Sequence, residues 1–175
     1  MGRRFTIVAM LATLGAGGVG AQEHGQGAHG GAGHGHPRHG RHAASDTGFA
    51  ALQQRGKVAM GVDQYTSRHR FEPLPDGGRI ELVRDEADSA GVATIRAHLS
   101  GIAESFARGD FRTPAFVHQQ EVPGTRVMAE RREKIRYHYR PLPGGGEVRI
   151  VTTDSLAVDA VHRFLEFQRR DHRAH

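Results

Sequence analysis

The 175-residue chain contains no cysteine. This absence excludes a thiolate nucleophile, structural disulfides and the cysteine-based zinc, iron–sulfur and c-type haem motifs. The chain also lacks a GxSxG nucleophile elbow, a P-loop, an HExxH zinc motif and a GxGxxG motif that follows a strand and opens a helix. No motif therefore indicates an enzyme class or a catalytic residue, and any metal site must use His, Met, Asp or Glu side chains.

The only long hydrophobic run lies near the N-terminus. Two arginines precede an apolar stretch from Phe5 to Leu14, and a triplet of small residues ends at Ala21. This pattern is typical of a secretory signal peptide, here residues 1–21, cleaved before Gln22. The apolar run is too short for a transmembrane helix, and no second run indicates an anchor. We therefore expect a periplasmic or extracellular protein with no stable membrane span after signal removal.

The chain has a net positive charge, but its basic residues are not concentrated in one segment. Loss of the two signal-peptide arginines leaves 22 basic and 19 acidic residues, a net charge of +3 with histidine neutral. Lysine occurs only at positions 57 and 134, and acidic residues are mixed among the arginines throughout. Proteins that bind nucleic acid usually present a continuous basic surface. The mixed charges of this chain provide none, so the sequence predicts no nucleic-acid partner. The sequence does not indicate whether the chain binds another protein.

A segment rich in glycine and histidine follows the signal peptide. Residues 22–48 are too poor in apolar side chains to fold alone, and we expect this tail to be disordered. Its six histidines are His24, His29, His34, His36, His39 and His42. A glycine chain lets several imidazoles converge on one copper, nickel or zinc ion. The alternative interpretation is a solvated linker.

The remainder is interpreted as a connector or docking arm, residues 49–64, and a single α+β domain, residues 65–173. The domain contains an internal repeat. Segments 69–85 and 136–154 each place Pro-Leu-Pro before a glycine-rich turn, with alternating apolar and polar residues after it. This pattern predicts two β-hairpins, because glycine permits the positive φ of tight turns. The repeat is either a duplication or two uses of one turn.

A helix is predicted after each hairpin. The first begins near Asp88, carries apolar residues at helical spacing and stops at Gly109, and the second begins near Asp154. A third, short helix is expected at residues 124–133. The order ββα-ββα predicts an α+β fold in which both hairpins form one antiparallel sheet with the helices packed on one face.

The domain also contains candidate metal ligands. His98 and His162 border the apolar faces of the two long predicted helices. Imidazoles combined with a thioether suit copper, because soft sulfur favours Cu(I). The candidate cluster is His98, His118, Met128, His162 and His172. The alternative interpretation makes the helix histidines boundary residues with satisfied nitrogens and Met128 a core filler.

Several segments resemble a known group of proteins in order and spacing. They are HRFEPLPDGGRIEL, IRAHLSGIAESFARGDF, PAFVH, PGTRVM, IRYHYRPLPGGGEVRIVT and AVHRFLEFQRRDH. Over residues 60–173 the chain resembles small exported bacterial proteins of unknown function, some of which are labelled aspartate carbamoyltransferase. The resemblance implies export and the domain boundary but no mechanism. Carbamoyltransferases have a Ser-Thr-Arg-Thr phosphate loop, whereas the nearest string here, residues 66–69, enters a predicted strand.

The sequence therefore predicts an exported transition-metal-binding protein, with copper or another late divalent ion favoured. In this hypothesis the tail captures the ion and a His/Met site in the domain holds it. The alternative is a non-catalytic module that binds a small ligand or a protein. A third class is an enzyme, as the carbamoyltransferase label suggests.

Overall fold

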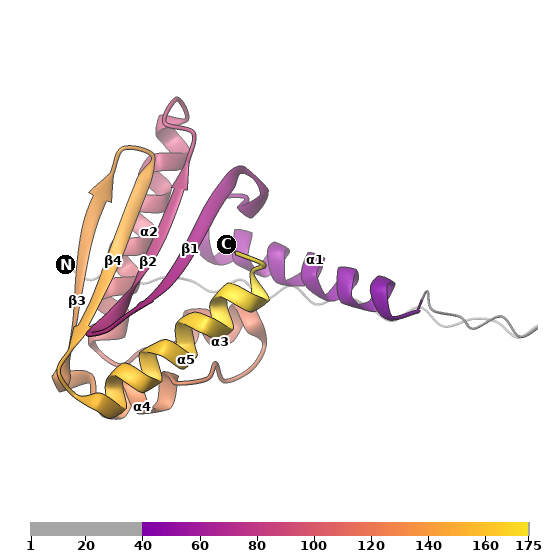
Figure 1. Ribbon diagram of the computed structural model, residues 1–175. Coiled ribbons are helices and arrows are strands. Elements are labelled where there is room, and N and C mark those ends of the chain that lie inside the picture. The colour runs from indigo at the N-terminus through magenta and orange to yellow at the C-terminus, as the bar shows by residue number, and fades with distance from the viewer. Residues whose placement is uncertain (1–39, 175) are drawn as a thin grey trace, which may run out of the picture. The chain divides into compact units, whose positions relative to one another are not determined.

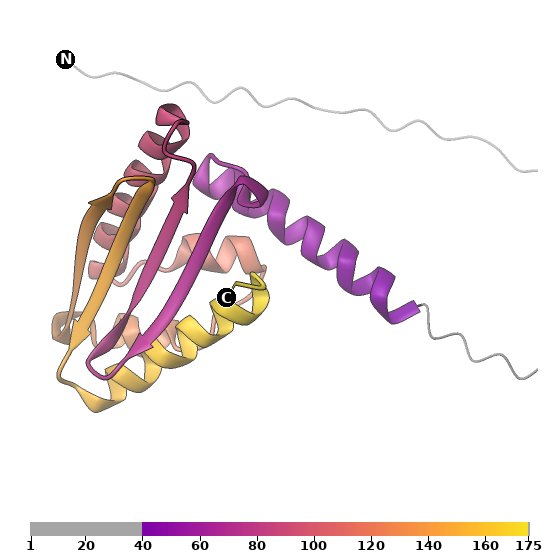
Figure 2. The same ribbon diagram turned by 45° about the horizontal axis from the view of Figure 1, so that its top comes forward.

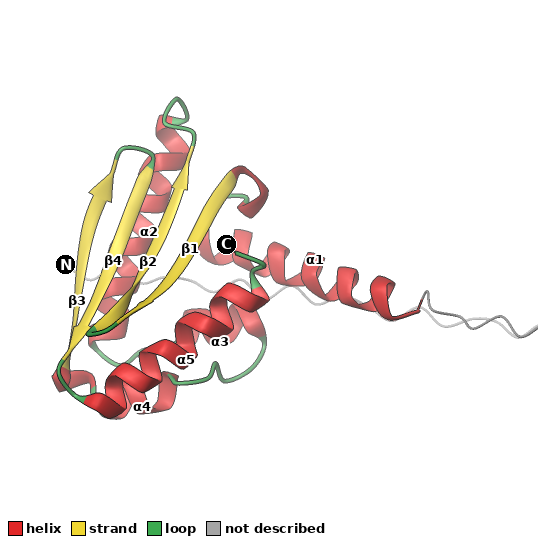
Figure 3. Cartoon of the chain, in the orientation of Figure 1, coloured by secondary structure: helices red, strands yellow, loops and turns green. Residues whose placement is uncertain are grey.

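The computed structural model describes residues 40–174, in which four antiparallel strands form one sheet with the order β1-β2-β4-β3. The strands are β1 (Ser67–Leu74), β2 (Gly77–Arg84), β3 (Ile135–Leu142) and β4 (Gly145–Thr152). Each predicted hairpin is present, and the two hairpins meet through β2 and β4. The α+β fold class predicted from the sequence is confirmed (Figure 3).

The glycines of the repeat serve more than one purpose: Gly77 has a positive φ of 135°, whereas Gly145 permits a close contact between the hairpins. The two-residue loops are Pro75-Asp76 and Pro143-Gly144, so the glycines that follow them begin β2 and β4. A Cβ atom on Gly145 would lie only 2.1 Å from the carbonyl oxygen of Leu82 on the neighbouring strand. Glycine is required at this position because the two central strands approach closely, and not because the turn needs it.

Two long helices follow the hairpins, α2 (Ser89–Ala107) and α5 (Ser155–Asp171). Asp88 and Asp154 cap them, since each side chain accepts a hydrogen bond from the backbone N–H three residues on. Each helix crosses to the other hairpin: α2 packs on β3 and β4, whereas α5 packs mainly on β1 and β2 (Figure 1). No helix of the described residues crosses the sheet on the side that faces the viewer in Figure 2.

The core lies between these helices and the covered face of the sheet. The apolar side chains at helical spacing in α2 are buried, as the 3.6-residue period predicts. Among the fully or almost fully buried residues are Leu82, Ile95, Leu99, Phe106, Val148, Ile150, Val161, Phe164 and Leu165. The core thus fixes α2 and α5 against the sheet, and with them the side chains that these helices carry.

The uncovered face of the sheet carries charges of both signs. Glu147 is only 6% exposed and forms ion pairs with Arg79 and Arg140. Arg79 also pairs with Glu72. These pairs place carboxylates among the arginines, so the face is not an uninterrupted basic stripe.

The first helix differs most from the expectation. Helix α1 (Gly40–Met60) occupies the end of the segment predicted to be a disordered tail and most of the predicted connector. Leu52, Gly56 and Met60 are buried on one side of α1, which packs on α3 and α2. This burial explains why the segment is helical and part of the domain.

The connection between the two repeat units contains more helix than predicted. Helix α3 (Arg112–His118) lies in a segment for which no helix was predicted. The predicted helix at 124–133 is split into α4 (Thr125–Glu130) and the 3-10 helix η2 (Arg132–Lys134), and a further 3-10 helix, η1 (Gln64–Thr66), precedes β1. Helix α3 brings its last residue, His118, against the C-terminal end of α5.

Candidate functional site

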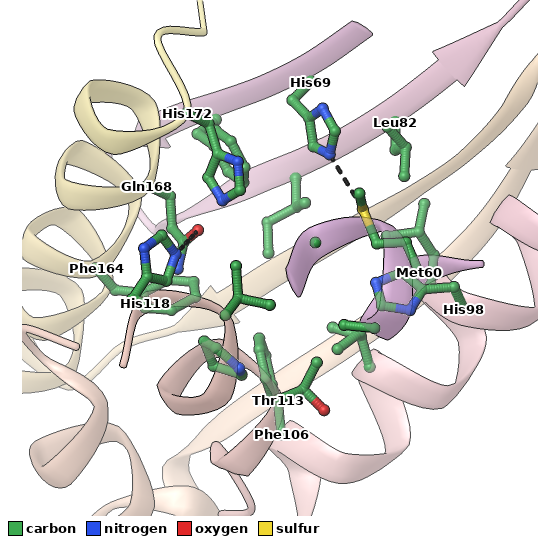
Figure 4. Close-up of a pocket in the computed structure, with 18 residues that line it drawn as sticks. Met60, His69, Leu82, His98, Phe106, Thr113, His118, Phe164, Gln168 and His172 are labelled. Carbon is green, nitrogen blue, oxygen red and sulfur yellow. Dashed lines mark hydrogen bonds between the residues drawn. The ribbon is translucent and has the colours of Figure 1, made fainter. Parts of the chain in front are cut away.

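A small cavity of about 80 Å³ lies among α1, β1, α2, α3 and α5. Most of its lining is apolar, but four histidines and one methionine also contribute to it (Figure 4). They are Met60, His69, His98, His118 and His172. Because each comes from a different element or from the residue that follows one, the folded chain alone brings them together.

Met60 and His69 place a thioether beside an imidazole. His69 Nε2 donates a hydrogen bond to Met60 Sδ, and the two atoms lie 3.3 Å apart (Figure 4). The His98 ring hydrogen-bonds to the backbone of Ala59, the residue before Met60. The cavity lining therefore combines the Met60 thioether with imidazoles from the sheet and from α2.

Burial keeps three imidazoles of this cavity neutral, those of His69, His98 and His172. Desolvation lowers the pKa of His69 to about 4, with a smaller contribution from repulsion by His98. Desolvation also lowers the pKa of His98, and it lowers the pKa of His172 to about 3, with repulsion from His69 and His118 as lesser causes. A neutral imidazole carries the lone pair that a metal ion requires, so His69, His98 and His172 have the right protonation state at neutral pH.

His118 contacts His172 at the other end of the cavity. The ring of His172 stacks on that of His69, with centroids 5.4 Å apart, and meets His118 edge-on at 5.0 Å. His118 Nδ1 donates to the carboxylate of Asp171, and its Nε2 lies 3.0 Å from Gln168 Oε1. Both nitrogens of His118 are engaged, so this residue positions its neighbour rather than offering a lone pair.

Three of the five predicted domain ligands line the cavity: His98, His118 and His172. The other two lie elsewhere. Met128 is fully buried in the core, where it fills space as the alternative interpretation expected. His162 Nε2 hydrogen-bonds to the carbonyl oxygen of Leu74 at 2.9 Å, which satisfies a histidine at the boundary of the core.

Two residues of the cavity were not in the predicted cluster, Met60 and His69. The alternation of β1 contained a signal for His69, because it shares the inward face of the strand with Phe71. Met60 follows Gly56 by four residues on the buried side of α1. That side was not recognised because the segment was interpreted as a connector.

The predicted tail ligands are mostly beyond the structure. His24, His29, His34, His36 and His39 lie outside the described residues, and His42 lies in the first turn of α1. Within residues 40–174, no three His, Asp or Glu side chains form a metal-binding group by themselves. A site in this part of the chain would therefore need a ligand of another kind, such as a methionine sulfur. No helix of the same residues is both long and apolar enough to cross a membrane.

Comparison with family models, curated proteins and solved structures found no match to this chain. The resemblance noted in the sequence therefore stays a prediction.

Proposed function

We propose that the protein binds copper and that its cavity holds one Cu(I) ion between Met60 Sδ and His69 Nε2. The observation that carries the proposal is their 3.3 Å separation. A late first-row metal binds imidazole nitrogen at about 2.0 Å and sulfur at about 2.3 Å, which at a tetrahedral angle places the two ligand atoms about 3.5 Å apart. The observed separation is close to this value. His98 or His172 is the third ligand.

The chemistry of the lining favours a soft monovalent ion. A thioether sulfur selects Cu(I), and imidazole suits copper in general. Among residues 40–174 no carboxylate lines the cavity, and Asp171 reaches it only through His118. Neutral ligands in an apolar cavity leave the charge of the ion uncompensated, and the desolvation cost of an ion rises with the square of its charge. Cu(I) is therefore easier to accommodate than a divalent ion.

The histidine tail supports copper binding by a second route. Its six imidazoles form unselective, weaker sites that raise the local concentration of copper near the domain. Export is part of the proposal and rests on the pattern of residues 1–21. N-terminal sequencing of the protein recovered from the periplasm or the medium should begin at Gln22. Recovery of an uncleaved chain from the cytoplasm contradicts export.

Competition titration with a colorimetric Cu(I) chelator tests the cavity. The six tail histidines are first changed to serine, so that any remaining copper is bound by the domain. We expect this variant to bind one Cu(I) per chain, and the added change His69→Phe to weaken binding at least about tenfold. A matched control is His138→Phe, on an exposed histidine of β3 outside the cavity. Loss of all Cu(I) binding with the tail histidines contradicts the proposal.

A further inference from the structure

The cavity has more space than one copper ion needs. Its volume is about 80 Å³. About 10–15 Å³ of such volume is enough for one water molecule, whereas an apolar cavity of about 150 Å³ holds a benzene molecule. The cavity therefore has room for a small ion and for one further molecule of a few atoms, but not for a larger organic ligand.

The lining around this space is mainly apolar (Figure 4). Its buried apolar side chains come from β2, α2 and α3 and include Ile80, Leu82, Leu99, Ile102, Phe106 and Val117. An uncharged molecule of a few atoms gains dispersion contacts with such a lining and loses little hydration when it enters. An anion or a polar molecule loses hydrogen bonds to water that the lining does not replace.

The polar side chains of the lining bond mainly to other groups of the protein. Both nitrogens of His118 are engaged, one by Asp171 and one by Gln168. The ring of His98 donates to the backbone of Ala59. A buried water molecule usually makes about three hydrogen bonds, and these side chains leave few donors and acceptors for it. Water is therefore a poor occupant of the apolar part of the cavity.

The stacked histidines leave one position of the proposed ion open. A ligating histidine usually donates its other ring N–H to a backbone carbonyl or a carboxylate, as His98 does to Ala59, so His98 suits the third position. His172 stacks on His69 with only 12° between the ring planes. An ion lies in the plane of each imidazole that binds it, and two stacked, nearly parallel planes share no such point. His172 therefore does not complete a tetrahedral site in this arrangement.

We propose that Cu(I) in the cavity keeps its fourth position open and binds there one small uncharged diatomic molecule, such as dioxygen. The inference rests on the proposed copper site. Three protein ligands and one exchangeable ligand are the usual arrangement of a tetrahedral metal that reacts with small molecules. Coordination forms one bond between the ion and the diatomic molecule and breaks none. The apolar lining favours the diatomic molecule over water at this position.

Infrared spectroscopy under carbon monoxide, in the absence of dioxygen, tests this inference. The protein carries serine in place of the six tail histidines and is loaded with Cu(I), and chelator titration measures its copper content. We expect one C–O stretching band that saturates at one carbon monoxide per copper and shifts with isotopically labelled gas. A fully loaded protein without this band overturns the inference but leaves the copper site intact. A protein that binds no copper overturns both.

Variants that fill the apolar part of the cavity locate the bound gas. Leu99→Phe should keep its Cu(I) affinity, because it changes no ligand, and should weaken carbon monoxide binding at least about tenfold by occupying its space. Val117→Ile adds a single methylene and serves where the larger change impairs folding, with a smaller loss of the same sign. The control Leu156→Phe makes the first exchange at an exposed position of α5 outside the cavity. Wild-type affinity for carbon monoxide in the cavity variants overturns the inference.

Discussion

His69 Nε2 lies 3.3 Å from Met60 Sδ, and this contact joins the last residue of α1 to the edge strand β1. The contact makes α1 part of the cavity wall, because the Met60 thioether lies beside the histidines only while α1 packs on the domain. The copper proposal therefore requires that α1 stays packed on the domain. A helix that merely linked a tail to the domain would have no such requirement.

Two methionines allow copper binding to be separated from stability. Met60→Leu conserves volume and should cost under about 1.5 kcal/mol of unfolding free energy, yet weaken Cu(I) binding by the domain at least about tenfold. Met128→Ala leaves a hole in the core and should cost about 2–5 kcal/mol without changing the affinity of the folded chain for Cu(I). Urea denaturation and chelator competition measure the two effects. Wild-type copper affinity in Met60→Leu contradicts the assignment of the sulfur ligand.

The metal-free protein should lose stability on acidification because its cavity histidines are neutral. The pKa of His69 is lowered to about 4 and that of His172 to about 3, whereas imidazoles of the unfolded chain protonate near pH 6.5. Between these values the unfolded state binds more protons, so unfolding free energy falls as the pH falls. His69 alone contributes on the order of 3 kcal/mol of this loss once the pH is below its lowered pKa.

Denaturation midpoints across the range from about pH 7 to about pH 4 measure this loss. The variant His69→Phe keeps an aromatic ring without a titrating nitrogen, so its stability should depend less steeply on pH. His138→Phe, at an exposed position of β3, serves as the control and should keep the wild-type dependence. The same slope in His69→Phe as in the wild type would show that the cavity histidine is not responsible.

Two glycines test the close contact between the hairpins. Gly145→Ala places a Cβ against the backbone of β2 and should cost about 1–3 kcal/mol, since a carbonyl oxygen cannot move aside. Gly101→Ala meets no atom within 4 Å in the middle of α2 and should stabilise the protein by up to about 1 kcal/mol. Thermal unfolding of both variants gives the comparison. Equal effects of the two changes contradict the close-contact argument.

The local features of the fold could be predicted from the sequence because their signals are local. Alternation defined the strands, the 3.6-residue period defined the buried side of α2, and Asp88 and Asp154 cap their helices as expected. Gly109 has the positive φ of a helix stop, as predicted. The exchange of helices between hairpins has no such signal, because it depends on how the two units pack.

The site was only partly predictable for the same reason. His98, His118 and His172 were in the predicted cluster, whereas His69 was not. His69 precedes its stacking partner His172 by more than 100 residues, and no pattern in the sequence indicates a contact over that separation. The full length of helix α1 was not predicted because Gly56 resembles a break in a helical pattern, although it lies on the buried side where it lines the cavity. Long-range contacts of this kind follow from tertiary packing alone.

X-ray absorption spectroscopy of the Cu(I)-loaded protein, with the six tail histidines changed to serine, tests the central claim most directly. The account predicts one sulfur atom at about 2.3 Å from copper together with imidazole nitrogens at about 2.0 Å. It also predicts that Met60→Leu removes the sulfur signal. A shell of nitrogen atoms only, unchanged by Met60→Leu, contradicts the account.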